Sequence, residues 1–75
     1  MINKIIATVS SVLKTKISEN TIQKNCDKWD SLMHINIIIA LEDAFDLSFE
    51  PEEIAQMTGI NAIQQIISKK QDIEI

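Results

Sequence analysis

The sequence predicts an all-α fold, a small four-helix bundle with three longer helices, a short third helix and a long loop between the first two. Large apolar residues recur at three- and four-residue spacing in several stretches, which gives a helix one apolar face. The single proline and the single glycine, Pro51 and Gly59, fall where a helix would begin and where one would be interrupted. No stretch shows the alternation of a half-buried strand. Helices with one apolar face must bury those faces against one another, which favours a bundle.

The first helix is expected over residues 2–14, where six apolar residues follow the helical spacing: Ile2, Ile5, Ile6, Val9, Val12 and Leu13. From about Thr15 to Trp29 this periodicity weakens, and polar side chains that compete for backbone hydrogen bonds become frequent. We interpret this segment as a long loop with room for one helical turn, held down by Ile17, Ile22 and Trp29. Long loops in compact domains are often functional.

The second helix is expected over residues 31–45. Asp30 and Ser31 stand at its start, and both residue types favour the N-cap, where a side-chain oxygen accepts a hydrogen bond from the first turn. The Ser31 hydroxyl is therefore expected to be exposed, rigidly placed and near the positive end of the helix dipole. At about 100° per residue, one side of this helix forms the core side. That side carries His34, Ile37, Ile38, Leu41, Ala44 and Phe45.

A short third helix is expected over residues 51–57. Pro51 suits its first position, because the N–H that proline lacks would have no helical partner there. The acidic residues around it, Glu50, Glu52 and Glu53, complement the positive end of the helix dipole.

Thr58 and Gly59 end this helix, and a fourth helix is expected over residues 60–70. Its apolar residues recur at helical spacing: Ile60, Ile63, Ile66 and Ile67. Lys69 and Lys70 suit its negative C-terminal end. Residues 71–75 are expected to form a frayed tail.

Size and composition narrow the class of protein. The 75 residues are enough for a single small domain over residues 1–75, with little room for a deep catalytic cleft. Cys26 is the only cysteine, so an internal disulfide is excluded and a reducing compartment is favoured. The longest apolar stretch, from Ile37 to Leu41, is far shorter than a membrane span of about 20 residues. No cleavable signal is visible, so we expect a cytoplasmic protein, and we expect it to be monomeric.

The formal net charge of −4 and the absence of arginine argue against a nucleic-acid partner, because phosphate binding needs clustered basic residues. The acidic residues crowd into one stretch of the chain: Glu42, Asp43, Asp46, Glu50, Glu52 and Glu53. The lysines of the first half of the chain all precede this acidic stretch. Such an asymmetric field favours protein partners with basic docking patches.

The order and spacing of several motifs resemble the acyl carrier protein family. The most specific part is Asp30-Ser31-Leu32, followed by an apolar helix that ends in Ala40-Leu41-Glu42 and its acidic extension. The segments Phe49-Glu50-Pro51 and Thr58-Gly59-Ile60 then follow in the same order, and the resemblance extends from Ile2 to about Lys70.

This resemblance implies that Ser31 carries a covalent 4′-phosphopantetheine arm, whose terminal thiol holds an acyl group as a thioester. The protein would then be a carrier that catalyses nothing itself. A phosphopantetheinyl transferase would attach the arm from coenzyme A with magnesium, and acyl-loading and acyl-transferring enzymes would be the other partners. In the complex with the transferase Asp30 would hold the metal or orient the partner; its alternative role is a local helix cap.

The outward side of the second helix is the expected partner surface. It carries Leu32, Met33, Ile35, Asn36, Ile39, Glu42, Asp43 and Asp46. Apolar residues gathered on an exposed face suggest a contact surface, and the acids would attract basic partner residues. The structural alternative is that Ile35 and Ile39 pack beneath the long first loop. By resemblance, fatty-acid carriers place acids where Met33 and Asn36 stand, and a glycine where Trp29 stands. These departures favour a dedicated pathway over general fatty acid synthesis.

Three other functions compete with that of an acyl carrier. A peptidyl or aminoacyl carrier has the same fold and the same modified serine, and an unmodified helical adaptor would need only the apolar surface. A serine hydrolase built from Asp30, Ser31 and His34 is disfavoured, because all three lie at one helix start and no second element offers a pocket. His34 is instead expected to be a partly buried helix residue, and Cys26 a small loop residue.

Overall fold

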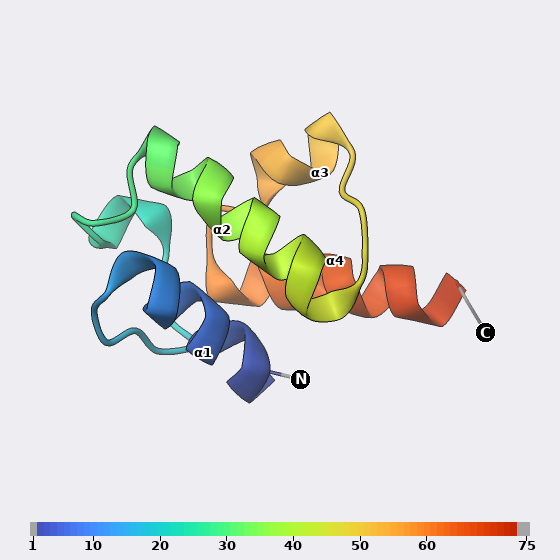
Figure 1. Ribbon diagram of the computed structural model, residues 1–75, viewed down its shortest axis with the longest axis horizontal. Helices are drawn as coiled ribbons and strands as arrows, with labels where there is room; N and C mark the ends of the chain where they lie inside the picture. The colour runs from blue at the N-terminus through green and yellow to red at the C-terminus, as the bar shows by residue number, and fades with distance from the viewer. Residues whose placement is uncertain (1, 74–75) are drawn as a thin grey trace.

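The computed structural model describes residues 2–73, and it is a bundle of four helices (Figure 1). These are α1 (Ile2–Leu13), α2 (Ser31–Phe45), α3 (Pro51–Gln56) and α4 (Ile60–Ile73), with a 3₁₀ turn at Gln23–Asn25 in the loop between α1 and α2. α1 packs against α2 and α4, and α3 packs against α4. The predicted all-α four-helix bundle is confirmed. None of the helices within residues 2–73 has the length and apolar character needed to cross a membrane.

The core is built from the apolar faces that the spacing predicts and from two loop aromatics. Its buried apolar residues are Ile5, Val9, Leu13, Trp29, Ile37, Ile38, Leu41, Phe49, Met57, Ile60, Ile63 and Ile67. The predicted core side of α2 is confirmed, with His34, Ile37, Ile38 and Leu41 buried and Ala44 and Phe45 half-buried. Trp29 and Phe49 join this core from the segments that precede α2 and α3.

The long loop after α1 is attached to the α3–α4 junction by its backbone. The Gln23 N–H donates to the Thr58 carbonyl at 2.7 Å, and the Ile60 N–H donates to the Thr21 carbonyl at 3.1 Å. Ile22 was expected to hold the loop down, but its side chain is exposed. The backbone on either side of Ile22 makes the attachment instead. Gly59 permits this close approach, since a Cβ there would lie 2.7 Å from Ile22 Cγ2.

The helix boundaries differ from the expected ones mainly at the C-terminal end. α1 ends at Leu13 because Lys14 adopts a left-handed conformation with φ 57°. α3 ends at Gln56, one residue earlier than expected. α4 continues to Ile73, so residues 71–73, which were expected to belong to a frayed tail, are helical. The Lys70 side chain contacts Glu53 of α3 and the Phe49 ring in the loop before α3. These contacts favour a helical conformation around Lys70 and so the continuation of α4. Residues 74–75 lie outside the described part of the chain.

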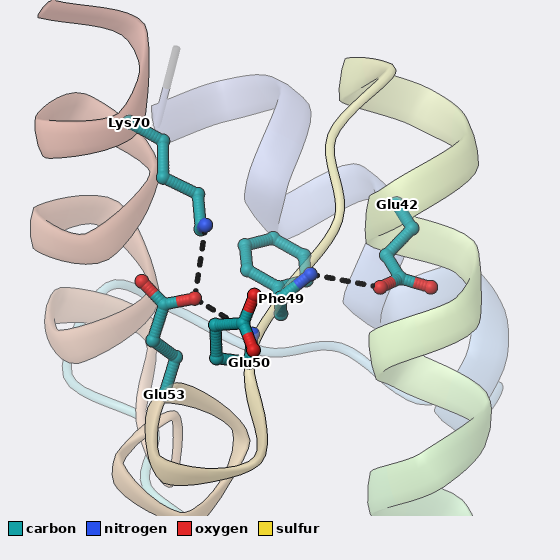
Figure 2. A network of polar contacts seen from close by, with 5 residues as sticks. All are labelled: Glu42, Phe49, Glu50, Glu53 and Lys70. Carbon is teal, nitrogen blue, oxygen red and sulfur yellow. Dashed lines mark hydrogen bonds and ion pairs between the residues drawn. The ribbon is translucent and has the colours of Figure 1, made fainter. Parts of the chain in front are cut away.

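A polar network joins α2, α3 and α4 around the loop before α3 (Figure 2). Glu42 of α2 accepts a hydrogen bond from the Phe49 backbone N–H through Oε2 at 2.9 Å. Glu53 of α3 accepts one from the Glu50 N–H at 2.8 Å, and its Oε1 also lies 2.9 Å from Lys70 Nζ of α4. The Lys70 ammonium lies over the Phe49 ring, 5.7 Å from its centroid. The network thus places α3 relative to the two helices on either side of it.

These contacts act on the protonation of Glu53. The backbone hydrogen bond from Glu50 and the nearby Lys70 ammonium both favour the charged carboxylate, and they lower the pKa of Glu53 below its ordinary value of 4.5. Because the folded-state pKa is depressed, the stabilisation is present in full above the unfolded-state pKa and is lost as the pH falls through the folded-state pKa.

Glu53→Gln should lower the free energy of unfolding by about 0.5–1 kcal/mol at about pH 7, a small cost because the ion pair is partly exposed. The difference from wild type should persist down to about pH 5 and shrink in more acidic solution, as the wild-type carboxyl is also neutralised. Urea unfolding across this pH range measures it. Glu52→Gln, which removes the same charge from an exposed neighbour without a bond in the structure, is the control. If the difference in unfolding free energy between wild type and Glu53→Gln stays constant as the pH falls, the charged Glu53 carboxylate is not its source.

Candidate functional site

The start of α2 is fixed by Asp30 and not by Ser31. Asp30 has extended backbone angles, and its Oδ1 accepts a hydrogen bond from the Met33 N–H at 2.8 Å, which makes it the N-cap. The Asp30 carbonyl also accepts the His34 N–H at 2.8 Å. Of the two residues that could cap this helix, the structure uses the aspartate. Ser31 is therefore the first residue inside the helix.

At this position the Ser31 hydroxyl takes no part in the contacts that hold the fold. Ser31 is exposed, and its hydroxyl makes no hydrogen bond to any part of the chain that the structure describes. The N-terminal end of α2 lies at an edge of the bundle (Figure 1). The backbone N–H groups of the first turn give this end a positive potential that favours a phosphate group. A hydroxyl presented in this way can accept a bulky substituent without disturbing the core.

The residue two positions before Ser31 anchors this end of the helix. Trp29 is 2% exposed, and its indole Nε1–H donates a hydrogen bond to His34 Nδ1 at 3.0 Å. The two rings stack with their centroids 6.1 Å apart. Because Nδ1 accepts this bond, the ring proton is on Nε2, which donates to the Ile54 carbonyl of α3 at 2.8 Å. One buried chain of hydrogen bonds thus connects the loop, α2 and α3.

This geometry argues against a Ser31–His34–Asp30 catalytic triad. Both ring nitrogens of His34 are engaged with partners other than the serine, and the imidazole is on the core side of α2. Asp30 uses Oδ1 to cap the helix and makes no bond to the imidazole in the described structure. Neither His34 nor Asp30 is therefore placed as a general base for Ser31. His34 is a helix residue as predicted, but it is buried and not only partly buried, and Cys26 is a half-buried loop residue.

The outward side of α2 carries an exposed apolar strip made of Leu32, Ile35 and Ile39. Their exposed fractions are 68%, 49% and 59%. The alternative that Ile35 and Ile39 pack beneath the first loop is therefore wrong. Asn36 lies exposed beside the strip, with its Nδ2 3.8 Å from the sulfur of the half-buried Met33. Three large apolar side chains facing water on one helix are typical of a protein contact surface.

The acids at the far end of α2 divide into two kinds. Glu42 is half-buried and its carboxylate holds the backbone of Phe49, so it has a structural task. Asp43 and Asp46 are exposed, and their carboxylates make no bond within residues 2–73. Asp46 has a left-handed backbone with φ 55°, and its N–H closes the helix on the Glu42 carbonyl. Of the three predicted partner-binding acids, Asp43 and Asp46 have carboxylates available to a partner.

The chain is similar to the acyl carrier protein homolog of Mycoplasma pneumoniae, with 35% identity over an alignment of 63 residues. The alignment covers 76% of this chain and 75% of that protein. No family model matches the sequence.

Proposed function

The chain belongs to the acyl carrier protein family, and we propose that it carries acyl groups as thioesters on a 4′-phosphopantetheine arm attached to Ser31. One observation supports this assignment above the others: the Ser31 hydroxyl is exposed and unbonded at the first position of a capped helix, with the positive end of that helix beside it. The protein itself supplies position and no catalysis.

Attachment of the arm is a phosphoryl-group transfer carried out by a partner transferase. The Ser31 oxygen attacks the phosphorus that bears the pantetheine in coenzyme A. The new oxygen–phosphorus bond forms as the diphosphate bond breaks, adenosine 3′,5′-bisphosphate leaves, and the hydroxyl proton passes to a base of the transferase. Asp30 Oδ1 is occupied by the helix cap, while Oδ2 makes no bond in the described structure and is available to the magnesium ion that accompanies coenzyme A. The N-terminal end of α2 stabilises the resulting phosphodiester.

The apolar strip and the exposed acids form the surface that partner enzymes use. Leu32, Ile35 and Ile39 supply apolar contact next to the attachment site, and Asp43 and Asp46 attract basic residues at the other end of α2. After the capping Asp30, α2 has no acid before Glu42, and Met33 and Asn36 stand in its first half. Recognition along the first half of α2 is therefore mainly apolar, which favours partner enzymes of a dedicated pathway over those of general fatty acid synthesis.

Incubation with coenzyme A, magnesium and a promiscuous phosphopantetheinyl transferase should increase the intact mass by one phosphopantetheine group. Ser31→Ala should abolish this increase, because it removes the attacking oxygen. Ser48→Ala is the matched control, since Ser48 is an exposed loop serine outside α2, and it should load like wild type. If the wild-type chain gains no mass with any competent transferase, the unmodified adaptor becomes the better assignment.

Reversing the charge of Asp43 should slow loading by a transferase with a basic docking patch. We expect Asp43→Lys to reduce the rate about 3- to 10-fold at low ionic strength, with the difference shrinking as salt screens the charges. Glu42 is unsuitable for this experiment, because its removal would also release the Phe49 backbone. Glu52→Lys makes the same charge change on an exposed residue of α3 and is the control. Equal rates for the two variants would remove the electrostatic part of the proposal, provided that circular dichroism shows unchanged helix content.

A further inference from the structure

The buried chain from Trp29 through His34 to Ile54 crosses from α2 to α3 one turn beyond Ser31. Trp29 donates to Nδ1 of the imidazole, and Nε2 donates to the Ile54 carbonyl. His34 and Ser31 are three residues apart on the same helix, so this crossing lies close behind the attachment position. A direct bond from a side chain of α2 to the backbone of α3 closes the space between the two helices at this point.

This bond helps to place α3, together with the network around Glu53 and Phe49. α3 has only six residues, and its last carbonyl groups have no partners within a regular helix. The Ile54 carbonyl accepts the His34 Nε2–H together with the Met57 N–H at 3.2 Å. Met57, directly after the helix, is fully buried. The imidazole thus satisfies the end of α3 and holds it against α2 at once.

The same bond would resist the entry of an apolar chain. Among the described residues no buried side-chain nitrogen or oxygen lacks a hydrogen-bond partner. An alkyl chain that separated α2 from α3 would break the bond between His34 and Ile54 and leave the Nε2–H of the buried imidazole without a partner, because a hydrocarbon offers no acceptor. The Ile54 carbonyl would keep its bond from the Met57 N–H. The core side chains Ile37, Leu41 and Ile63 are fully buried and leave no face open to water. Entry therefore carries a polar penalty in addition to the work of opening packed side chains.

We propose that Trp29 and His34 form a latch that closes the seam between α2 and α3 behind Ser31, so that the carried acyl group stays outside the bundle. This inference rests on the proposed function and identifies the class of cargo. A long alkyl chain held in water loses the favourable burial of its apolar surface, whereas a short or polar acyl group loses little. The carrier is therefore suited to short or polar acyl groups that partner enzymes reach without first extracting them from the protein.

The experiment loads the full chain with straight acyl groups of two to ten carbons, using acyl-coenzyme A and a promiscuous transferase, and confirms each product by intact mass. The thermal midpoint of wild type should vary by less than about 2 °C across the series, since no chain is buried. Backbone amide resonances of the core and the Trp29 indole N–H resonance should not move with chain length. A midpoint that rises steadily with chain length, or core resonances that shift with it, would overturn the proposal. Failure to load at all would instead count against Ser31 as the attachment site.

His34→Leu tests the latch itself, because leucine keeps much of the volume and cannot bond to Ile54. In this variant the midpoint should rise by at least about 4 °C from the two-carbon to the ten-carbon product, as an apolar seam becomes able to accept the chain. Gln56→Leu adds the same side chain to an exposed position of α3 and should behave like wild type. If His34→Leu folds and shows no dependence on chain length, His34 is not the closing element. If it does not fold, the wild-type series alone decides.

Discussion

The fixed start of α2 is the constraint on which the rest of the structure depends. Trp29 is buried and bonded to His34, while Asp30 closes the first turn through Met33. These two contacts act on consecutive residues, one pulling the chain into the core and the other turning it into a helix. The next residue, Ser31, can then only begin the helix at its exposed end. A rigid position for the serine thus follows from the burial of its neighbour, and the serine itself takes no part in stability.

α2 serves two surfaces at once. Its inner side supplies Ile37, Ile38 and Leu41 to the core, and its outer side presents the apolar strip of Leu32, Ile35 and Ile39 to water. A helix that only packed against the bundle would have no use for the second set. Water-facing leucine and isoleucine carry a cost in solubility, which binding to partner enzymes would offset. His34 lies on the inner side as well, where its bonds to Trp29 and Ile54 add polar contacts to the apolar packing.

The two ends of α2 have different electrostatic tasks. At the N-terminal end the chain offers backbone dipoles and little side-chain charge beyond the capping Asp30, which suits an anionic phosphodiester. At the other end the acids have separate roles, since Glu42 holds the loop before α3 and Asp43 remains available to partners. Lys70 and Glu53 complete the attachment of α3 from the side of α4. α3 is thus held by polar contacts from α2 and from α4. A small number of hydrogen bonds sets its position relative to α2.

The sequence by itself determined the four helices, the core side of α2 and the serine at its start, because apolar spacing, Pro51 and the capping residues are local signals that act within a few residues. Only the tertiary structure decided which residue caps α2, since Asp30 and Ser31 have nearly equal preferences for that position. It also decided that Ile35 and Ile39 face water and that the Glu42 carboxylate bonds to the Phe49 backbone. In the same way it placed the Ile22 side chain at the surface while the Ile22 backbone pairs with that of Gly59. The pairing of His34 with Ile54 and of Glu53 with Lys70 joins residues far apart in the chain. Such contacts depend on how helices are placed in space, which no periodicity within one helix specifies.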